Sequence, residues 1–309
     1  MEDYNKIIES LGVKYIKSRS IRVLAPVTID NYYDVSNTLI VLHKGEISFG
    51  PDKLVVSEGD LLFIPAARQM SITYGHNTAN TRMTNEDMLN NRDKFLSSIK
   101  DAAQVGVEEN SFSYLTFEAK VFDSVNFYAS LDIPPFILTG KNTHLGQMIT
   151  ETVTEELSNF PGRDRLIKIN AERVAVEVMR YIINHNLFVE QLATNITYFK
   201  DPRLLDIFAY IKNNLGGDLS NKVLAGVANV SEDYVGQYFK MLTGINPQDY
   251  IEYQRMEMAV NLLRTSKKSI REIGAEVGYK DTAYFCRRFK MMFGIPAGKM
   301  RRRESLMNI

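Results

Sequence analysis

The sequence lacks the features that would assign it to a membrane or secreted class. No apolar run approaches the roughly 20 residues that a helix needs to cross a bilayer, and the opening residues Met1 to Tyr4 lack the basic and apolar regions of a secretion signal. Cysteine occurs once, at Cys286, which excludes an intrachain disulfide and a thiolate metal site made by this residue alone. We therefore expect a cytoplasmic protein.

The chain also lacks a net charge, because 37 Lys and Arg side chains balance 37 Asp and Glu. Taken alone, this balance gives no indication of nucleic acid or an anionic membrane as a partner. It is a cancellation, however, because residues 201–309 carry 17 basic and 12 acidic side chains, a net charge of +5, and residues 1–200 carry −5. Residues 241–309 alone hold 13 basic and 7 acidic side chains. This asymmetry indicates that the C-terminal part contacts nucleic acid or a membrane surface.

Short apolar runs between turn residues predict a β domain at residues 1–140. The 309 residues suffice for about two domains, and 45% hydrophobic and 24% charged residues exclude wholesale disorder. Between about Ser20 and Tyr74 the expected strands are Leu39–Leu42, Glu46–Phe49, Leu54–Val56 and Leu61–Ile64. Strands this short and closely spaced favour an antiparallel barrel or jelly roll. After a polar insertion at about 76–110, with a helix around Asn85–Val105, we expect strands at Phe112–Val121 and Asn126–Tyr128.

Helical periodicity begins at His144 and predicts a segment of two helices within residues 141–200. One apolar stripe comprises Leu145, Met148, Ile149, Val153 and Leu157, and Pro161-Gly162 ends it. The second comprises Ile169, Val174, Val178, Tyr181, Ile182 and Ile183. Two packings remain equally open, because a single apolar face does not reveal its partner. The helices pack on the β domain or on the same helices of a second subunit.

The last hundred residues contain an internal repeat. Tyr, Phe, Lys, Met, Gly and Ile of residues 234–245 recur 50 residues later in residues 284–295. Matching segments, Leu224–Val230 and Ile273–Tyr279, precede the two copies. Each copy predicts a helix, a short turn and a second helix, which is a helix-turn-helix unit. We place the units at about 218–246 and 267–296.

Capping residues give the predicted helices their ends. Ser220 and Ser269 are expected N-caps of the first helices, Ser231 and Asp281 of the second helices, and Gly244 and Gly294 close them. Pro247 is the expected first residue of a long helix that joins the copies. A helix of about 18 residues spans roughly 27 Å, which places the units about one DNA turn, ~34 Å, apart. One chain can then reach two adjacent major grooves.

The second helix of each unit has an outward face that predicts contact with DNA. Placing side chains at 100° per residue points Phe285 and Phe289 inward and Arg287 outward. Arg287 is the strongest candidate for a base, because Arg on guanine is the commonest specific contact. Glu232 and Asp233 repel phosphates, so we expect the second unit to contribute more affinity. The predicted DNA-contacting residues are Asp233, Gly236, Gln237, Lys240, Lys280, Thr282, Ala283, Cys286, Arg287, Arg288, Lys290, Arg301 and Arg302.

Residues 201–309 resemble the DNA-binding domain of AraC-family transcription regulators. The matching residues are Leu224-Ala225, Ser231, Tyr234, Phe239-Lys240, Gly244, Pro247, Tyr250, Arg255, Ala259, Leu262-Leu263, Ile270, Ile273, Val277–Tyr279, Tyr284-Phe285, Phe289-Lys290, Phe293-Gly294 and Arg301. The sequence departs from the family pattern at Gly274, Ala283 and Ala297. None of these departures removes a basic group. The resemblance implies a DNA-binding transcription regulator with two helix-turn-helix units, and RNA polymerase as a further partner.

The first half is similar to the cupin-like sensor domain of the same family, on the Gly45-Glu46 turn and the segment Gly59–Pro65. The resemblance implies that this domain binds a small effector or dimerises, and that residues 141–200 form the homodimer. Tyr32, Phe49 and Phe63 are the candidate effector contacts, although core packing is the favoured explanation for these three residues. The expected fold class is therefore α+β, with a cupin-like antiparallel barrel or jelly roll, a helical dimerisation segment and an all-α C-terminal domain.

Two other functions remain open at this stage. A cupin-type enzyme tethered to DNA needs convergent histidines and a carboxylate for a metal, but His43 and Glu46 stand alone and no phosphate loop or nucleophile elbow occurs. We therefore expect no catalytic residue, no cofactor and no metal. The second alternative is a ligand-independent dimeric architectural DNA binder. The effector, the operator and the direction of regulation are not encoded in any recognisable motif.

Overall fold

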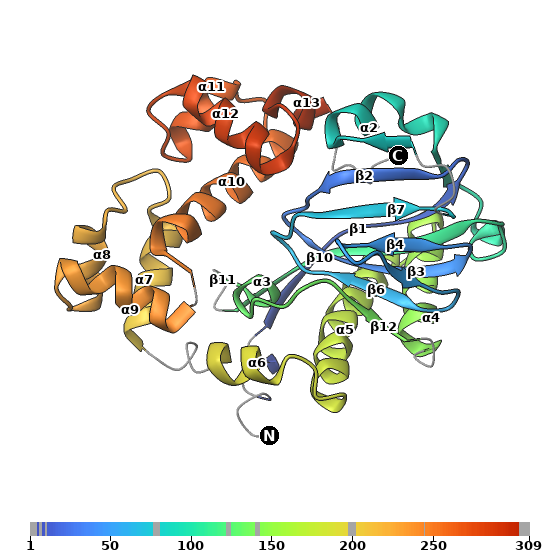
Figure 1. Cartoon of the computed structure of the whole chain (residues 1–309), viewed down its shortest axis with the longest axis horizontal. Coiled ribbons are helices and arrows are strands. Elements are labelled where there is room, and N and C mark those ends of the chain that lie inside the picture. Colours follow the sequence, from blue (N-terminus) through green and yellow to red (C-terminus); the bar gives the residue numbers. More distant parts are fainter. Residues whose placement is uncertain are drawn as a thin grey trace. The chain divides into compact units, whose positions relative to one another are not determined.

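The computed structural model describes residues 11–76, 81–121, 125–139, 143–196, 202–243 and 245–302, together with Asn5, Ile8 and Glu9. The chain divides into two compact units, whose elements are labelled in Figure 1. The β unit comprises Gly12–Ala119 and Pro134–Leu187. The helical unit comprises Phe188–Asn308 together with Lys120–Ile133 and Met1–Leu11. The expected helix-turn-helix units all fall in the helical unit.

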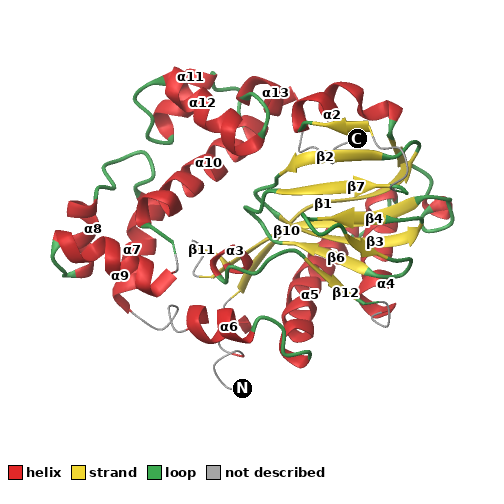
Figure 2. Cartoon of the chain, viewed as in Figure 1, coloured by secondary structure: helices red, strands yellow, loops and turns green. Residues whose placement is uncertain are grey.

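Two sheets form the β unit (Figure 2). The larger has the order β12 (Phe136–Leu138), β6 (Leu61–Ile64), β3 (Asn37–Lys44), β10 (Ser111–Val121), β1 (Leu11–Val23), β9 (Leu96–Ile99). The smaller has the order β5 (Leu54–Val56), β4 (Ile47–Phe49), β7 (Met70–Tyr74), β2 (Val27–Tyr32), β8 (Thr81–Met83). Tyr74 of the smaller sheet stacks on Phe112 of the larger, with ring centroids 5.0 Å apart. The two sheets therefore share one aromatic core.

The strands expected between Leu39 and Ile64 are confirmed as β3 to β6. β3 pairs with β6 and β10 in antiparallel register, and every side chain of β6 is buried. The short apolar runs form strands because a strand in the middle of the larger sheet is covered on both faces. The chain enters the sheet earlier than expected, since β1 begins at Leu11 rather than near Ser20.

The helix expected over Asn85–Val105 is mostly wrong. Only α2 (Asn85–Asn91) is an α-helix, followed by the 3₁₀ turns η1 (Arg92–Lys94) and η2 (Ala102–Gln104) and, between them, strand β9. β9 pairs with Ser20–Val23 of β1 and buries Leu96 and Ile99. Pairing with the open edge of β1 satisfies its backbone groups, and this tertiary gain overrides the weak helical preference of a polar segment.

The strand expected at Asn126–Tyr128 is also shorter than predicted. β11 (Val125–Asn126) pairs with the end of β10, and the chain then turns into the short helix α3 (Phe127–Ser130). The Asn126 side chain accepts a hydrogen bond from the Ala129 backbone N–H at 3.5 Å, as an N-cap does. The local capping chemistry of Asn126 therefore ends the strand that the aromatic residues suggested.

Helices α4 (Thr143–Leu157) and α5 (Arg163–Asn184) pack on the larger sheet, which decides between the two open packings for these faces. The Tyr15 hydroxyl of β1 donates to Glu156 of α4 at 2.9 Å, and Arg19 pairs with the same carboxylate at 3.3 Å. Phe136 of β12 stacks on Tyr181 of α5. The expected stripe of α4 is confirmed, because Leu145, Met148, Ile149 and Val153 are buried.

The expected stripe of α5 is wrong at one position. Ile169 is 44% exposed, whereas Ile167, Ala171, Val174 and Val178 are buried. Residues spaced by three or four lie on one side of a helix, and a residue two positions away lies about 200° around it. Ile169 is therefore on the outer side of α5, together with Leu166.

The core of the helical unit includes a helix that the sequence did not predict. Its helices are α6 (Val189–Ile196), α7 (Pro202–Asn213), α8 (Asn221–Ala228), α9 (Glu232–Thr243), α10 (Pro247–Thr265), α11 (Ile270–Glu276), α12 (Thr282–Phe293) and α13 (Ala297–Arg302). Phe208 of α7 packs edge-on against Phe239 of α9 at 5.5 Å and Tyr250 of α10 at 5.1 Å. α7, which was not predicted, therefore supplies part of the first core.

His43 of β3 makes the stability of the β unit dependent on pH. Burial lowers the pKa of His43 to about 4, and its Nε2 lies 2.8 Å from the Ser113 hydroxyl. The folded protein holds the imidazole neutral, so this stability is present above the unfolded pKa of about 6.5 and is lost as the pH falls from there towards 4. Each unit in that window costs up to about 1.4 kcal/mol. We expect His43→Gln to flatten the dependence of Tm on pH between 6.5 and 4, measured by thermal denaturation. An unchanged slope would contradict this role.

Candidate nucleic-acid interface

The two predicted repeats form two helix pairs, α8–α9 and α11–α12, which we call the first pair and the second pair. Asp281 caps α12 by accepting from the Ala283 and Tyr284 backbone N–H groups at 2.7 and 2.9 Å, and these bonds lower the pKa of its carboxyl. Ser269 caps α11 in a capping box with Glu272. Gly294 ends α12 with φ of 71°, and Gly244 lies outside the described residues. The predicted ends of the second pair are thus confirmed.

In the second pair the crossing of the two helices depends on a small residue. A Cβ added to Gly274 of α11 would lie 3.3 Å from the ring of Phe285 of α12. Phe285, Phe289 and Phe293 are buried, and neighbouring rings lie 5.7 and 4.4 Å apart. The departure from the family pattern at Gly274 therefore allows α11 to approach the aromatic face of α12 closely.

The long joining helix is confirmed as α10, which begins at Pro247. Arg255 in its middle donates from Nε to the Leu215 carbonyl and from Nη2 to the Gly217 carbonyl, both at 2.9 Å. One turn earlier, Glu252 accepts two hydrogen bonds from the guanidinium of Arg288 in α12. α10 is thereby bonded both to the segment that precedes the first pair and to the second pair.

The turn of the second pair lies directly against Arg255. A Cβ on Gly278 would lie 2.7 Å from Cζ of Arg255 and 2.8 Å from the Leu215 carbonyl oxygen, and the residue has φ of +90°. The corresponding residue of the first pair is Asn229, whose φ of 56° is also left-handed. Both turns need this conformation, which Asn tolerates. Only at 278 does the neighbouring guanidinium restrict the residue to glycine.

The outward face of α9 is exposed as predicted. Asp233, Gln237 and Lys240 are exposed, and Gly236 is half-buried beside Asn221 of α8. Val235 and Phe239 point into the core, where both are buried. The face therefore begins with the acidic Asp233 and continues with the neutral Gln237 and the positively charged Lys240.

The outward face of α12 carries more cations. Ala283, Arg287 and Lys290 are exposed, Cys286 and Thr282 are half-buried, and Lys280 precedes the helix in an exposed turn. The Arg287 guanidinium lies 6.0 Å from the centroid of the Tyr284 ring. Six of the seven predicted positions in this helix and the turn before it are thus at least partly accessible, and their contact with DNA stays a prediction.

Three other predicted DNA contacts have different surroundings. Arg288 is half-buried and forms an ion pair with Glu252. The Tyr279 hydroxyl donates a hydrogen bond to the same carboxylate. Arg301 of α13 donates to the Lys268 backbone carbonyl. The side chain of Arg302 lies outside the described residues. Arg288 and Arg301 therefore have structural partners, and their contact with DNA stays a prediction.

Sequence reasoning did not include two exposed tyrosines at equivalent positions of the repeat. Tyr234 of α9 is 43% exposed and Tyr284 of α12 is 48% exposed. They stand 50 residues apart in the sequence, and each is the third residue of its helix. The repeat itself was the signal that identifies them, because large aromatic side chains recurring on a polar face are not needed for the core.

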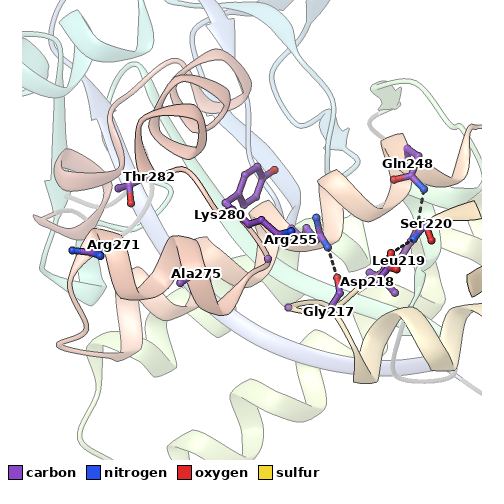
Figure 3. A pocket seen from close by; sticks show the side chains of 13 residues that line it. Gly217, Asp218, Leu219, Ser220, Gln248, Arg255, Arg271, Ala275, Lys280 and Thr282 are labelled. Carbon is purple, nitrogen blue, oxygen red and sulfur yellow. Dashed lines mark hydrogen bonds between the residues drawn. The ribbon is translucent and has the colours of Figure 1, made fainter.

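An open cleft lies between the segment that precedes α8, helix α10 and the second pair, and Figure 3 shows the side chains that line it. Its volume is about 840 Å³. The segment Gly216–Ser220, residues Gln248 and Arg255 of α10, and Arg271, Lys280 and Thr282 of the second pair contribute to its walls. We call it the interpair cleft. All of these residues belong to the helical unit.

The three candidate effector residues of the β unit separate in the structure. Tyr32 and Phe63 are buried in the core at 1% and 0% exposure, and Phe63 contacts the rings of Phe117 and Phe136. Phe49 lines a cavity of about 330 Å³ together with hydroxyl side chains of the smaller sheet and the cations Lys53 and Arg82. The structure thus places Phe49 at this cavity and Tyr32 and Phe63 in the core.

The described residues contain neither a candidate metal centre nor a candidate membrane-spanning helix. No group of three or more His, Cys, Asp or Glu side chains among them is placed to hold a metal ion. Within the same ranges, no helix combines the length and the apolar character that crossing a membrane requires. Of the two residues considered for a metal, His43 lies beside Ser113, and Glu46 lies beside His76 at 3.5 Å.

The chain is similar to several known proteins. A family model described as a helix-turn-helix domain matches residues 224–303. The transposon Tn10 TetD protein of Escherichia coli is 30% identical over 130 residues, which cover 40% of this chain and 94% of that protein. An uncharacterized HTH-type transcriptional regulator of Haemophilus influenzae is 22% identical over 275 residues, 86% of each chain. Unsaturated fatty acid bound ToxT of Vibrio cholerae has the same fold, with a TM-score of 0.51 at 10% identity over 94% of this chain and 95% of that one.

The contact between Gly278 and Arg255 predicts a large cost for a single methyl group. Gly278→Ala forces a left-handed alanine and displaces the guanidinium, so we expect the free energy of unfolding to fall by about 2 kcal/mol or more. Gly226→Ala in α8 is the matched control, because nothing lies within 4 Å of its added Cβ. That variant gains up to about 1 kcal/mol from helix propensity. Urea denaturation followed by circular dichroism measures both, and equal stabilities for the two variants would contradict the packing.

Proposed function

Because the chain belongs to the AraC family of transcription regulators and is a DNA-binding regulator, we propose that it reads two adjacent major grooves with α9 and α12. The residues proposed to contact DNA are those of the two outward faces. Gln237 and Lys240 act from α9, and Arg287 and Lys290 act from α12. The proposal assigns residues 1–140 to effector sensing, 141–200 to dimerisation and 201–309 to DNA binding.

The observation that carries this proposal is the internal repetition of an exposed, polar helix face on one supporting helix. α10 has 19 residues, which corresponds to a length of about 28 Å. With the radii of the flanking helices added, the outward faces stand close to the ~34 Å that separates successive major grooves on one side of B-DNA. Bonds from Glu252 to the second pair and from Arg255 to the segment before the first pair support a spacing that is set before DNA binds.

The two pairs contribute unequally in this proposal. The second pair presents Lys280, Arg287 and Lys290 without an exposed acidic residue in the first turn of α12, whereas α9 begins with Glu232 and Asp233. Phosphate neutralisation dominates affinity for DNA. The second pair is therefore assigned most of the affinity, and Gln237 of the first pair adds a base contact.

The family supports a regulator that performs no catalysis of its own, and we propose that the β unit binds a small effector. The cavity beside Phe49 supports this assignment, because it combines one aromatic edge with four hydroxyl side chains and two cations: Thr28, Ser48, Ser71, Thr73, Lys53 and Arg82. The ToxT structure with an unsaturated fatty acid, which shares the fold, is a precedent for a ligand on this architecture. The proposed contacts at Tyr32 and Phe63 require opening of the core. Contact with RNA polymerase stays a prediction from the family.

We further propose that the protein is a homodimer through the outer side of α5. Leu166 and Ile169 are 47% and 44% exposed on this helix, and Phe160 before it is 70% exposed. Contiguous exposed apolar side chains of this size indicate an interface. The inner faces of α4 and α5 are covered by the larger sheet, so the outer side is the surface that remains for a partner.

Arg287 tests the assignment of base reading to α12. We expect Arg287→Ala to cost roughly 1–3 kcal/mol on the preferred duplex and to relax discrimination at one base pair. Arg287→Lys is the matched control, because it keeps the charge and loses the bidentate geometry. It should lose discrimination while the dependence of affinity on salt stays that of the unchanged protein. Fluorescence anisotropy on a duplex selected from a random library measures both quantities.

Two outcomes would overturn parts of this assignment. Unchanged selectivity in both Arg287 variants would remove α12 from base reading. Absence of any salt-dependent binding to duplex DNA by the full chain, with and without candidate effectors, would overturn the proposed mode of DNA binding as a whole.

The proposed dimer is tested by Ile169→Glu. A carboxylate buried at the interface without a partner should weaken the dimer by at least about tenfold, because its cost exceeds about 1.4 kcal/mol. Leu54→Glu is the matched control, since Leu54 is equally apolar and 51% exposed but lies on β5. Analytical ultracentrifugation should give a dimer for the control and a monomer for Ile169→Glu at the same concentration. If Ile169→Glu and Leu54→Glu both form dimers, the interface lies elsewhere.

A further inference from the structure

The interpair cleft is a concave surface of the helical unit that the proposed base contacts do not use. It is polar and open, with Arg255, Arg271 and Lys280 as its cations and Asp218 as its carboxylate. Apolar ligands need a largely apolar lining, and here only Leu219, Ala275 and the Tyr279 ring supply one. Charge and polarity therefore favour an anion as the occupant.

Two of the cations in the cleft are available to such an anion. Arg255 is committed to the carbonyl groups of Leu215 and Gly217. Arg271 and Lys280 are exposed, and neither makes a hydrogen bond or an ion pair with any residue in the described ranges. Figure 3 shows Arg271 and Lys280 on the side of the second pair, and Asp218 on the side of the first.

The carboxylate in the cleft is already satisfied from its own segment. Asp218 accepts from the Ser220 backbone N–H at 2.9 Å, and the hydrogen bonds from Ser220 are the main cause of its lowered pKa. Lys280 and Arg255 add a smaller electrostatic effect in the same direction. Asp218 therefore reduces the positive charge of the cleft without occupying Arg271, and a net positive charge remains.

The cleft is continuous with both proposed DNA-reading faces. Thr282, the first residue of α12, lines it. On the other side, Gln248 of the cleft donates to the side chain of Asn221 at 3.3 Å, and Asn221 lies 3.6 Å from the Cβ position of Gly236 on the outward face of α9. The cleft therefore borders the outward face of α12 and is joined to that of α9 through Gln248 and Asn221. When the two faces occupy adjacent major grooves, the DNA backbone between those grooves passes this part of the protein.

We propose that the interpair cleft binds the phosphodiester backbone between the two major grooves, with Arg271 and Lys280 neutralising its phosphates and the Thr282 hydroxyl at its rim. This inference rests on the proposed function. Its physical consequence is a contribution to affinity that does not depend on base sequence and that requires both half-sites on one duplex. The two cations thus fix the register of the protein across the site.

The test compares salt dependence among variants of the full chain. Each phosphate contact contributes about 0.9 to the slope of log K against log salt concentration. We expect Arg271→Ala and Lys280→Ala each to reduce the slope by about 0.9 and the double variant by about twice that, with unchanged discrimination between duplexes that keep both half-sites and differ at one base pair. Lys14→Ala, an exposed lysine of β1, removes the same charge from the other unit and should leave the slope unchanged. Circular dichroism verifies that each variant is folded.

A chemically modified duplex locates the contact. Methylphosphonate linkages at the phosphates between the half-sites should weaken binding of the unchanged protein as much as the double variant Arg271→Ala, Lys280→Ala does, and should weaken the double variant no further. A duplex with one half-site should bind all variants equally. Full additivity of the two changes, or an unchanged slope in both alanine variants while the wild type still binds DNA, overturns the cleft assignment and leaves the proposed function intact.

A free anion is the competing occupant, and calorimetry separates it from the DNA backbone. Inorganic phosphate titrated into the protein should give no saturable heat at millimolar concentration, because a single phosphate gains none of the register contacts. Saturable phosphate binding that Arg271→Ala abolishes, combined with unchanged salt slopes on DNA, would assign the cleft to a small anion and overturn the proposal. Failure of the wild type to bind any duplex would instead overturn the proposed function on which it rests.

Discussion

The helical unit depends on the hydrogen bonds that Glu252 and Arg255, one turn apart on α10, make with other segments. Arg255 donates to two backbone carbonyls of the segment before α8, and Glu252 binds Arg288 of α12. Because these side chains are three residues apart, they lie on one side of the same helix and link it to the second pair and to the segment before the first pair. The left-handed turn at Gly278 exists in the space that Arg255 leaves. A reader of two grooves needs a fixed spacing, and these charge-assisted bonds fix it more rigidly than apolar packing alone.

The basic excess of the C-terminal half accordingly has two uses. Arg255 and Arg288 act inside the fold, where their donors satisfy carbonyls and a carboxylate. Arg271, Lys280 and Arg287 remain exposed in the turn, cleft and outward face of the second pair. A count of charges measures only the sum of these groups. The surface field that a duplex meets comes from the second group, and this field is concentrated on one side of the repeat.

Sequence periodicity was reliable where one physical requirement dominated. Capping at Ser269 and Asp281, the proline start of α10 and the inward phenylalanines of α12 follow from local bonding and from a 3.6-residue period, and the structure contains all of them. It failed where distant groups compete. Leu96 and Ile99 have a spacing that suits a helix, but the open edge of β1 draws them into β9. Ile169 was assigned to a buried stripe because adjacent apolar residues obscure the phase of α5.

The sequence by itself determined the repeat, the helix ends of the second pair, the family and which residues of α12 face outward, because each follows from local spacing. Only the tertiary structure decided which cations are bonded within the fold: Arg255 donates to backbone carbonyls and Arg288 to the Glu252 carboxylate. It also decided that Tyr32 and Phe63 are core residues while Phe49 reaches a cavity. The reason is physical, since a side chain's partners come from segments far away in the chain, and no local pattern records their approach.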